Sequence, residues 1–268
     1  MQTDVVAATS SLDAALEALR ARGLGLRRGS EAPAPGRVVE ALPSGQPELD
    51  AALRTGGWPR GSLALLDATP GSGATTLALG SLAAVQERGG IVAWLDTPGV
   101  FDPATAARLG VRLEWLLVVR PASAAEAVEL AAWLARDRLL DALVLDPGTE
   151  AAGPVPRAAW DRLATLLPRT ESVALTLGSG ARAAESAAGI RLSLRRRAWL
   201  GVGRDLVGQR VVATVERHRW ALAGATATLD LWFAEGRRVD APLRAAAEPA
   251  PVEAVAPTRR RHLVALSA

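Results

Sequence analysis

Apolar and polar residues follow a regular pattern from residue 37 onward. Short runs that are apolar throughout are followed by longer segments in which apolar residues recur every three or four positions. The first pattern is typical of a buried strand and the second of an amphipathic helix. Strands are therefore predicted at 63–66, 91–95, 116–119, 142–145 and 173–177, and helices at 75–86, 103–109, 124–136 and 157–167. This order predicts βαβ units and a parallel sheet.

The pattern changes beyond a loop of small residues that is predicted at 178–189. Strand-like segments at 190–195, 210–217 and 226–233 then follow one another, with turns between them. Consecutive strands joined by turns pair in antiparallel fashion. The predicted fold class is therefore α/β, with a mainly parallel twisted sheet that is flanked by helices and ends in antiparallel strands.

The two ends of the chain lack this pattern. Near the N-terminus, Leu12, Leu16 and Leu19 fall on one face of a short predicted helix, and Pro- and Gly-rich linker residues follow it. The C-terminal end is rich in Ala, Pro and Glu, which is typical of a flexible tail. Three regions are predicted: an N-terminal helix and linker arm (1–36), a core domain (37–240) and a flexible C-terminal tail (241–268).

Composition narrows the chemistry that the chain can perform. The 268 residues include no Cys and two His, which excludes disulfides, thiol catalysis and zinc–cysteine sites and argues against a multi-histidine metal centre. We therefore predict no metal and no cofactor. Lys is also absent, so all 31 basic residues are Arg, and the formal net charge is +3. No apolar run reaches the roughly 18 residues of a membrane span, and the N-terminus does not resemble a signal peptide, so we expect a soluble, cytoplasmic protein with no membrane partner.

A glycine-rich segment lies between a predicted strand and a predicted helix, in the place of a Walker A phosphate-binding loop. It keeps two glycines and two hydroxyl residues of that motif, Gly71, Gly73, Thr75 and Thr76. A working loop begins with Gly and carries a Lys that reaches the β- and γ-phosphates, but Ala68 and Ala74 stand at these positions. The backbone can still cup an anion at the helix N-terminus, whereas the charge that holds a triphosphate is missing.

With their neighbours, these residues resemble the RecA family of recombination ATPases. Similar segments lie before the loop at 42–50 and 56–61, after it at 96–111, at 143–146, where the Walker B motif ends in Asp146, and in the closing strands at 190–196 and 217–236. The resemblance covers nearly all of residues 37–240 and implies a RecA-like core.

One departure from the family argues directly against ATP hydrolysis. The family places a catalytic glutamate two positions after Asp96, where this chain has Pro98, which can neither accept a proton nor position a water. Asp146 keeps the Walker B position, but a strand-end carboxylate that caps the next turn is the preferred explanation. We therefore expect a pseudo-ATPase with no catalytic residue and a degenerate, non-functional nucleotide site, formed by Gly71, Gly73, Thr75, Thr76 and Asp146.

The resemblance places the family's DNA-binding loops at 147–156 and 178–189, which are short and nearly uncharged here. Without aromatic residues to stack on bases, DNA binding is expected to be weak or absent. The best DNA candidates are basic residues of the closing strands, Arg195, Arg196, Arg197, Arg217 and Arg219. The last two fall where the family uses paired lysines to reach the neighbouring subunit's nucleotide. A solvated strand face or a protein interface explains the patch at least as well.

Residues 56–61, with the degenerate loop, are similar to the ImuA family of RecA-like accessory proteins in bacterial mutagenic repair. This resemblance implies a role in the SOS response to DNA damage and in translesion synthesis. The implied partners are RecA, an inactive Y-family polymerase homologue and an error-prone replicative polymerase subunit.

A fold that has lost its chemistry acts through its surfaces. The predicted partner contacts are the arm residues Leu12, Leu16 and Leu19, an exposed Trp58, and the tail residues Arg259, Arg260 and Arg261. Two alternatives stay open. One is a DNA-dependent ATPase or recombination mediator with an atypical nucleotide site, and the other is a SulA-type cell-division inhibitor that binds the division tubulin homologue.

Overall fold

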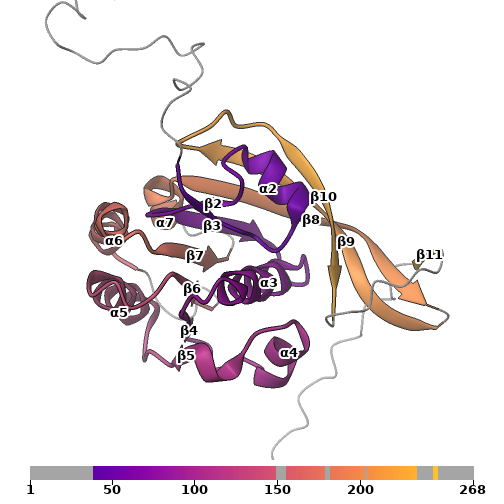
Figure 1. The fold of residues 1–268 in the computed structure, drawn as a ribbon, viewed down its shortest axis with the longest axis horizontal. Coiled ribbons are helices and arrows are strands. Elements are labelled where there is room, and N and C mark those ends of the chain that lie inside the picture. Colours follow the sequence, from indigo (N-terminus) through magenta and orange to yellow (C-terminus); the bar gives the residue numbers. More distant parts are fainter. Residues whose placement is uncertain (1–38, 149–154, 179–181, 203, 234–243, 247–268) are drawn as a thin grey trace, which may run out of the picture.

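The computed structural model describes residues 39–148, 155–178, 182–202, 204–233 and 244–246. Its centre is a nine-stranded sheet in which β11 pairs with β8 and the other strands follow the order β10-β9-β8-β3-β7-β6-β4-β5. Helices pack on both faces of the sheet (Figure 1). None of the helices in the described residues is long and apolar enough to cross a membrane.

The parallel half of the sheet confirms the predicted alternation of strands and helices. Its strands pair in parallel throughout. They are β3 (Leu63–Ala68), β4 (Val92–Asp96), β5 (Leu116–Val119), β6 (Ala142–Asp146) and β7 (Val173–Leu177). The helices that connect them are α3 (Ala74–Glu87), α4 (Pro103–Arg108), α5 (Ala124–Arg136) and α6 (Arg157–Thr170), with a 3₁₀ turn, η1 (Leu113–Trp115), before β5.

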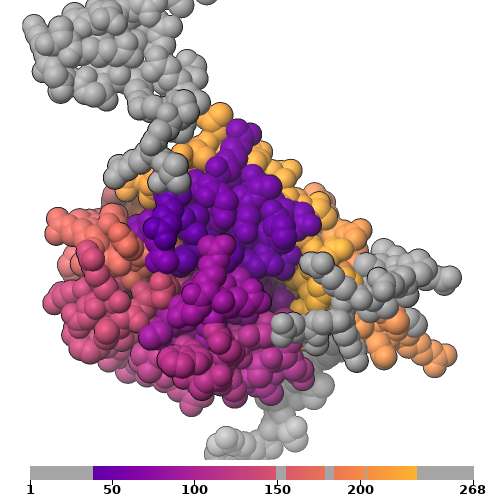
Figure 2. Space-filling model, in the orientation of Figure 1, coloured from indigo at the N-terminus to yellow at the C-terminus, as the bar shows by residue number. Residues whose placement is uncertain are grey.

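Alternate side chains of these strands enter two separate cores, because successive residues of a strand point to opposite faces. Ala64 and Leu66 belong to the core under α2, α3 and α4, whereas Leu63 and Leu65 belong to the core under α5, α6 and α7. Trp94 is 1% exposed in the first core, and its ring lies 5.4 Å from that of Phe101. The space-filling view in Figure 2 shows the surface that α2, α3 and α4 form over the first core.

The closing strands are antiparallel, as predicted, and the first two of them are longer than the pattern indicated. They are β8 (Ile190–Val202), β9 (Asp205–His218) and β10 (Thr226–Trp232). Together β8 and β9 form a long ribbon that extends beyond the helical layers (Figure 1). Because β8 also pairs in parallel with β3, this ribbon carries its side chains next to the glycine-rich loop that follows β3.

Two secondary-structure predictions are wrong. The segment expected to be a loop at 178–189 contains a short helix, α7 (Arg182–Ala187), because Ala184 and Ala188 are buried against the second core. Part of the predicted tail forms β11 (Arg244–Ala246), which pairs antiparallel with β8. The arm residues Leu12, Leu16 and Leu19 and the tail residues Arg259, Arg260 and Arg261 lie outside the described residues.

The segment at 56–61 closes the amino ends of the parallel strands. It follows β1 (Ala41–Leu42) and α2 (Pro47–Leu53) and includes β2 (Trp58–Pro59), which pairs with β1. Gly57 has φ of 138°, and a Cβ there would lie 2.1 Å from the carbonyl oxygen of Leu42, so only glycine fits. Trp58 is 1% exposed, and its indole nitrogen donates to the hydroxyl of Ser81 at 3.1 Å. The prediction that Trp58 is an exposed partner contact is therefore wrong, since the indole fills the core instead.

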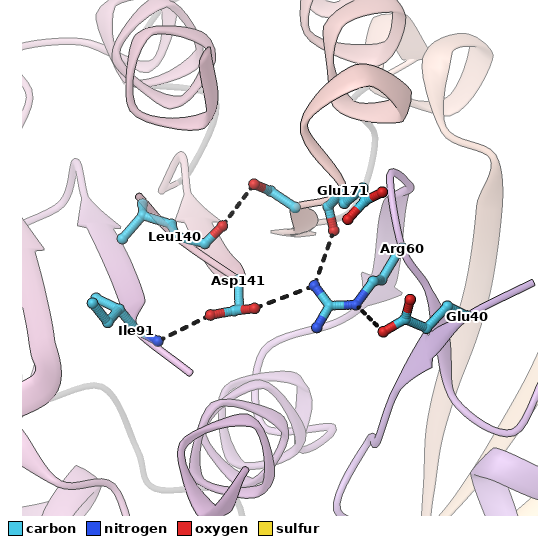
Figure 3. Close-up of polar contacts among 7 residues, drawn as sticks. Glu40, Arg60, Ile91, Leu140, Asp141 and Glu171 are labelled. Carbon is cyan, nitrogen blue, oxygen red and sulfur yellow. Dashed lines mark hydrogen bonds and ion pairs between the residues drawn. The ribbon is translucent and has the colours of Figure 1, made fainter. Parts of the chain in front are cut away.

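Arg60 joins this segment to the strand ends (Figure 3). Its Nε donates to Glu40 at 3.0 Å and one terminal nitrogen donates to Asp141 at 3.2 Å. The other carboxylate oxygen of Asp141 accepts from the backbone nitrogen of Ile91, also at 3.2 Å. Asp141 directly precedes β6 and Ile91 directly precedes β4. These contacts therefore hold the segment before β3 against the amino ends of β6 and β4.

Candidate functional site

The glycine-rich loop between β3 and α3 keeps the backbone shape of a phosphate-binding loop. Gly71 and Gly73 have φ of 77° and 92°, a region that glycine adopts most easily. Ser72 closes the loop on itself, because both its backbone nitrogen and its hydroxyl donate to the carbonyl oxygen of Thr69. Gly73 is the N-cap of α3 and provides no side-chain hydrogen bond, so the free backbone N–H groups at the start of the helix need other acceptors.

A cavity of about 540 Å³ opens above this loop. Its lining residues are Ala68, Thr69, Pro70, Gly71, Ser72, Gly73, Ala74, Thr75, Thr76, Gly148, Leu177, Gly178, Trp199, Gln209 and Phe233. None of these described residues carries a charge. A phosphate in this cavity would therefore lack a compensating cation, which makes its binding costly. The volume suits a small ligand, whereas the electrostatics do not suit a triphosphate.

The side chain of Gln209, from β9, occupies the place where the loop would hold an anion. Its amide nitrogen donates to the carbonyl oxygen of Gly71 at 3.0 Å, and its amide oxygen accepts from the backbone nitrogen of Gly73 at 3.1 Å. The amide orientation is assigned from these two partners. Gln209 is 3% exposed, and in this orientation a Cβ at Gly73 would lie 2.6 Å from its amide oxygen. A neutral internal group therefore uses the Gly73 N–H that an anion would need.

Arg196, from β8, also contacts the loop. One terminal nitrogen donates to the carbonyl oxygen of Gly71 at 3.0 Å, and the guanidinium stacks 4.3 Å from the ring centroid of Trp199. This cation–π contact and the hydrogen bond orient Arg196 toward the loop backbone. Arg196 thus places a cation against the loop backbone, but it does not line the cavity of about 540 Å³.

Asp146 ends β6 and behaves as a turn cap. Its carboxylate accepts from the backbone nitrogen of Gly148 at 3.1 Å, the contact expected of a strand-end carboxylate. Burial raises the pKa of Asp146, and the nearby charge of Asp96 raises it further, while the hydrogen bond from Gly148 opposes both. Asp96 is fully buried, accepts from the backbone nitrogens of Val100 and Phe101, and has Arg120 at 3.6 Å. Both carboxylates are therefore engaged in holding the loops that follow β4 and β6.

Comparison with known proteins identifies the family. The RecA N-terminal domain matches residues 21–162 of this chain. The chain is 32% identical to Protein RecA of Nocardioides sp. over 262 residues, which cover 84% of this chain and 74% of that relative. It is 32% identical to Protein RecA of Thermus thermophilus over 236 residues, covering 75% and 69%, and 30% identical to that of Bacillus velezensis over 234 residues, covering 74% and 67%. This chain belongs to the RecA family.

Within the RecA family, the loop after β4 carries the departure predicted to remove hydrolysis. Pro98 is exposed and lies against Gly148, where a Cβ would sit 3.4 Å from the proline ring. A proline ring offers no group that activates water. The described residues also contain no group of three His, Cys, Asp or Glu side chains that is able to hold a metal ion.

The basic residues of the ribbon separate into two places on this RecA-type sheet. Arg195, Arg196 and Arg197 line a smaller hollow of about 340 Å³ with the outer side of the glycine-rich loop. Arg217 lies opposite Arg191 in the register, about 13 Å along the strand from the first group. The structure therefore does not bring the five candidate DNA-binding arginines together.

Acidic groups interrupt the second place. Arg191 pairs with Asp67 at 2.8 Å, Glu216 at 2.9 Å and Glu185 at 3.3 Å. Hydrogen bonding to Asp67 raises the pKa of Arg191, so the guanidinium stays charged. Arg217 donates to the carbonyl oxygens of Glu185 and Ser186, at 3.1 and 3.2 Å, while Arg219 is exposed. These contacts tie α7 to the ribbon, which is a structural role.

Sequence reasoning missed Gln209. A glutamine in an otherwise apolar strand is a weak signal, because such residues commonly face solvent. The stronger signal was indirect: a loop without the lysine that holds a phosphate needs another acceptor for its backbone N–H groups.

Proposed function

We propose that this chain is a non-catalytic RecA-fold accessory protein that acts as an adaptor in DNA-damage-induced translesion synthesis. It would work by contacts with RecA and with error-prone polymerase components. The observation that carries the non-catalytic part is the Gln209 side chain in the loop, bound to Gly71 and Gly73. With Ala74 in the lysine position and an uncharged cavity, the loop acts as a structural turn.

Electrostatics support this proposal over ATP hydrolysis. A bound triphosphate needs cations on its β- and γ-phosphates and a group that positions water. The whole chain has no Lys to supply the first, and Pro98 stands where the family has its glutamate. Nucleotide binding would also have to displace Gln209, which costs the buried amide its partners.

Exposed apolar side chains support a role in protein contacts. Among the described residues, Leu113, Trp115, Leu117 and Val118 are 37–51% exposed and gather at η1 and β5. β5 is the outermost strand of the sheet at that side. An apolar edge strand is a template for pairing with another chain, and monomeric proteins usually protect it. This edge is the surface that we assign to RecA contact.

Nucleotide assays test the non-catalytic part. We expect neither saturable binding of a fluorescent ATP analogue up to about 1 mM nor phosphate release, with or without single-stranded DNA. The double variant Ala74→Lys/Gln209→Ala supplies the missing cation and opens the Gly73 N–H, so it is expected to gain binding. Ala74→Lys alone is the matched control in which Gln209 still blocks the loop. Tight ATP binding or DNA-stimulated hydrolysis by the natural sequence would favour the ATPase alternative.

Direct binding to purified RecA tests the adaptor part. RecA is immobilised with and without single-stranded DNA, and we expect binding at micromolar affinity or tighter. Leu117→Asp/Val118→Asp should weaken it, because two charges would be buried in the contact. Deletion of residues 1–36 should also weaken it if the predicted arm contributes. Absence of binding in both states contradicts the adaptor role and leaves binding to the division tubulin homologue as the next assay.

A further inference from the structure

A groove with mixed aromatic and basic character lies between α5 and α6, on the face opposite to α3. Its volume is about 670 Å³. The two helices lie side by side at the left of Figure 1, and their surface forms the left edge of the molecule in Figure 2. The lining residues are Glu129, Ala132, Trp133 and Arg136 from α5 and Asp161, Arg162, Thr165, Leu166 and Arg169 from α6.

Trp133 lies on α5 but outside the core that this helix forms with the sheet. It is 56% exposed, although the same helix buries Ala127, Val128 and Ala131 against the sheet. Spacing puts Glu129, Trp133 and Arg136 along one outward stripe, since residues three and four apart share a helix face. A large aromatic in a hollow on a solvent-facing stripe is the type of residue that anchors protein contacts.

The acidic residues of the groove have ion-pair partners, whereas two of its arginines have none among the described residues. Glu129 pairs with Arg162 across the groove at 3.5 Å, and Asp161 pairs with Arg157 on its own helix, also at 3.5 Å. Both acids are therefore neutralised. Arg136 and Arg169, in the last turns of the two helices, have no carboxylate partner among the described residues. One end of the groove thus carries an unbalanced positive charge next to an exposed indole.

We propose that this groove binds an acidic segment of a partner protein that carries an apolar or aromatic anchor side chain. The anchor packs against Trp133 and Leu166, and neighbouring carboxylates contact Arg136 and Arg169, whose planar guanidinium groups suit them. A nucleic acid fits less well because Arg136 and Arg169 lie at one end of the groove, whereas a phosphate backbone carries its charge continuously. A second copy of this chain would bring arginines against arginines. The inference goes beyond the proposed function, since it holds whether or not RecA is a partner.

Selection of displayed peptides against the full chain tests this site. Random peptides of about 12 residues are selected on the immobilised protein, and the consensus is synthesised with a fluorescent label for anisotropy. We expect a consensus with Asp or Glu flanking Leu, Phe or Trp. Trp133→Ala and Arg136→Glu/Arg169→Glu should each weaken its binding at least about tenfold. Added salt should weaken it as well.

Two matched variants control for general effects. Leu222→Ala removes an apolar side chain that is 50% exposed outside both proposed contact surfaces, and Arg88→Glu reverses an exposed arginine at the end of α3. Both should bind the peptide as the natural sequence does. The proposal is overturned if no acidic consensus emerges, or if the peptide binds Trp133→Ala unchanged. It is also overturned if single-stranded DNA displaces the peptide, or if Trp133→Ala abolishes a concentration-dependent dimer, because the occupant would then be a nucleic acid or a second copy.

Discussion

The two ends of the parallel sheet differ in what they keep in this RecA-family chain. At the amino ends of the strands, Trp58 fills the core and Arg60 pairs with Asp141, so the segment that leads into β3 is held by burial and charge. At the carboxyl ends, the glycine-rich loop keeps its backbone shape. Ala74 stands where phosphate binding would need a cation, and the Gln209 side chain occupies the Gly73 backbone N–H that a phosphate would need. The comparison teaches that a fold persists when its buried contacts persist, even where the cationic residue of its phosphate-binding loop is replaced.

The largest expected effect is at the amino end. Trp58→Ala empties a site that is 1% exposed and removes the hydrogen bond to Ser81, so the free energy of unfolding should fall by about 3–5 kcal/mol. Urea denaturation followed by circular dichroism measures it. Trp115→Ala, at a tryptophan that is 51% exposed, should cost less than about 1 kcal/mol. Equal losses for the two variants would contradict the structural role of Trp58.

Acid should weaken the same end next. Burial lowers the pKa of His218 to about 4, and its Nδ1 accepts from the backbone nitrogen of Trp220. The unfolded chain binds the proton near pH 6.5, so the contribution of His218 to stability is complete above that pH and is lost as pH falls toward 4. With allowance for solvent screening, the loss is about 2 kcal/mol. The urea midpoints of the natural sequence and of His218→Gln are measured at pH 7 and at pH 4.5. If both proteins lose the same stability between the two pH values, the assigned role of His218 is wrong.

Arg60 should contribute less than either. Arg60→Gln removes the pairs with Glu40 and Asp141, which are partly exposed, so a loss of about 1 kcal/mol is expected. A double-mutant cycle with Asp141→Asn isolates the coupling between the two side chains. A coupling free energy indistinguishable from zero would mean that Gly57 and Trp58 alone hold the chain entry.

The smallest effect is expected at the carboxyl end. Thr75 is exposed in the first turn of α3, and its hydroxyl would matter only if a phosphate and Mg²⁺ were bound. Thr75→Ala should therefore change the free energy of unfolding by less than about 0.5 kcal/mol and leave RecA binding unaltered. Loss of RecA binding in this variant would show that the loop still has a ligand-dependent role, and the contrast between the two ends would fail.

The candidate site was only partly predictable from sequence. The missing Gly and Lys at 68 and 74 and the proline at 98 are visible as residue types at fixed positions, so the loss of charge and base follows directly. Whether Trp58 is a surface anchor or a core residue is decided by the strands and helices packed around it, and the expectation of exposure failed. The helix α7 was missed because its alanines have no pattern of their own until the second core buries them.

The sequence by itself determined the alternation of strands and helices, the change to antiparallel pairing and the family, because periodicity and motif spacing are local properties. Only the tertiary structure decided what fills the glycine-rich loop. Gln209 lies far from Gly73 in the chain, and β8 must pair with β3 and then with β9 before that amide can reach the loop. The groove between α5 and α6 is likewise made by two helices that meet only on the folded sheet. Contacts between distant segments depend on strand order and register, which no local pattern encodes.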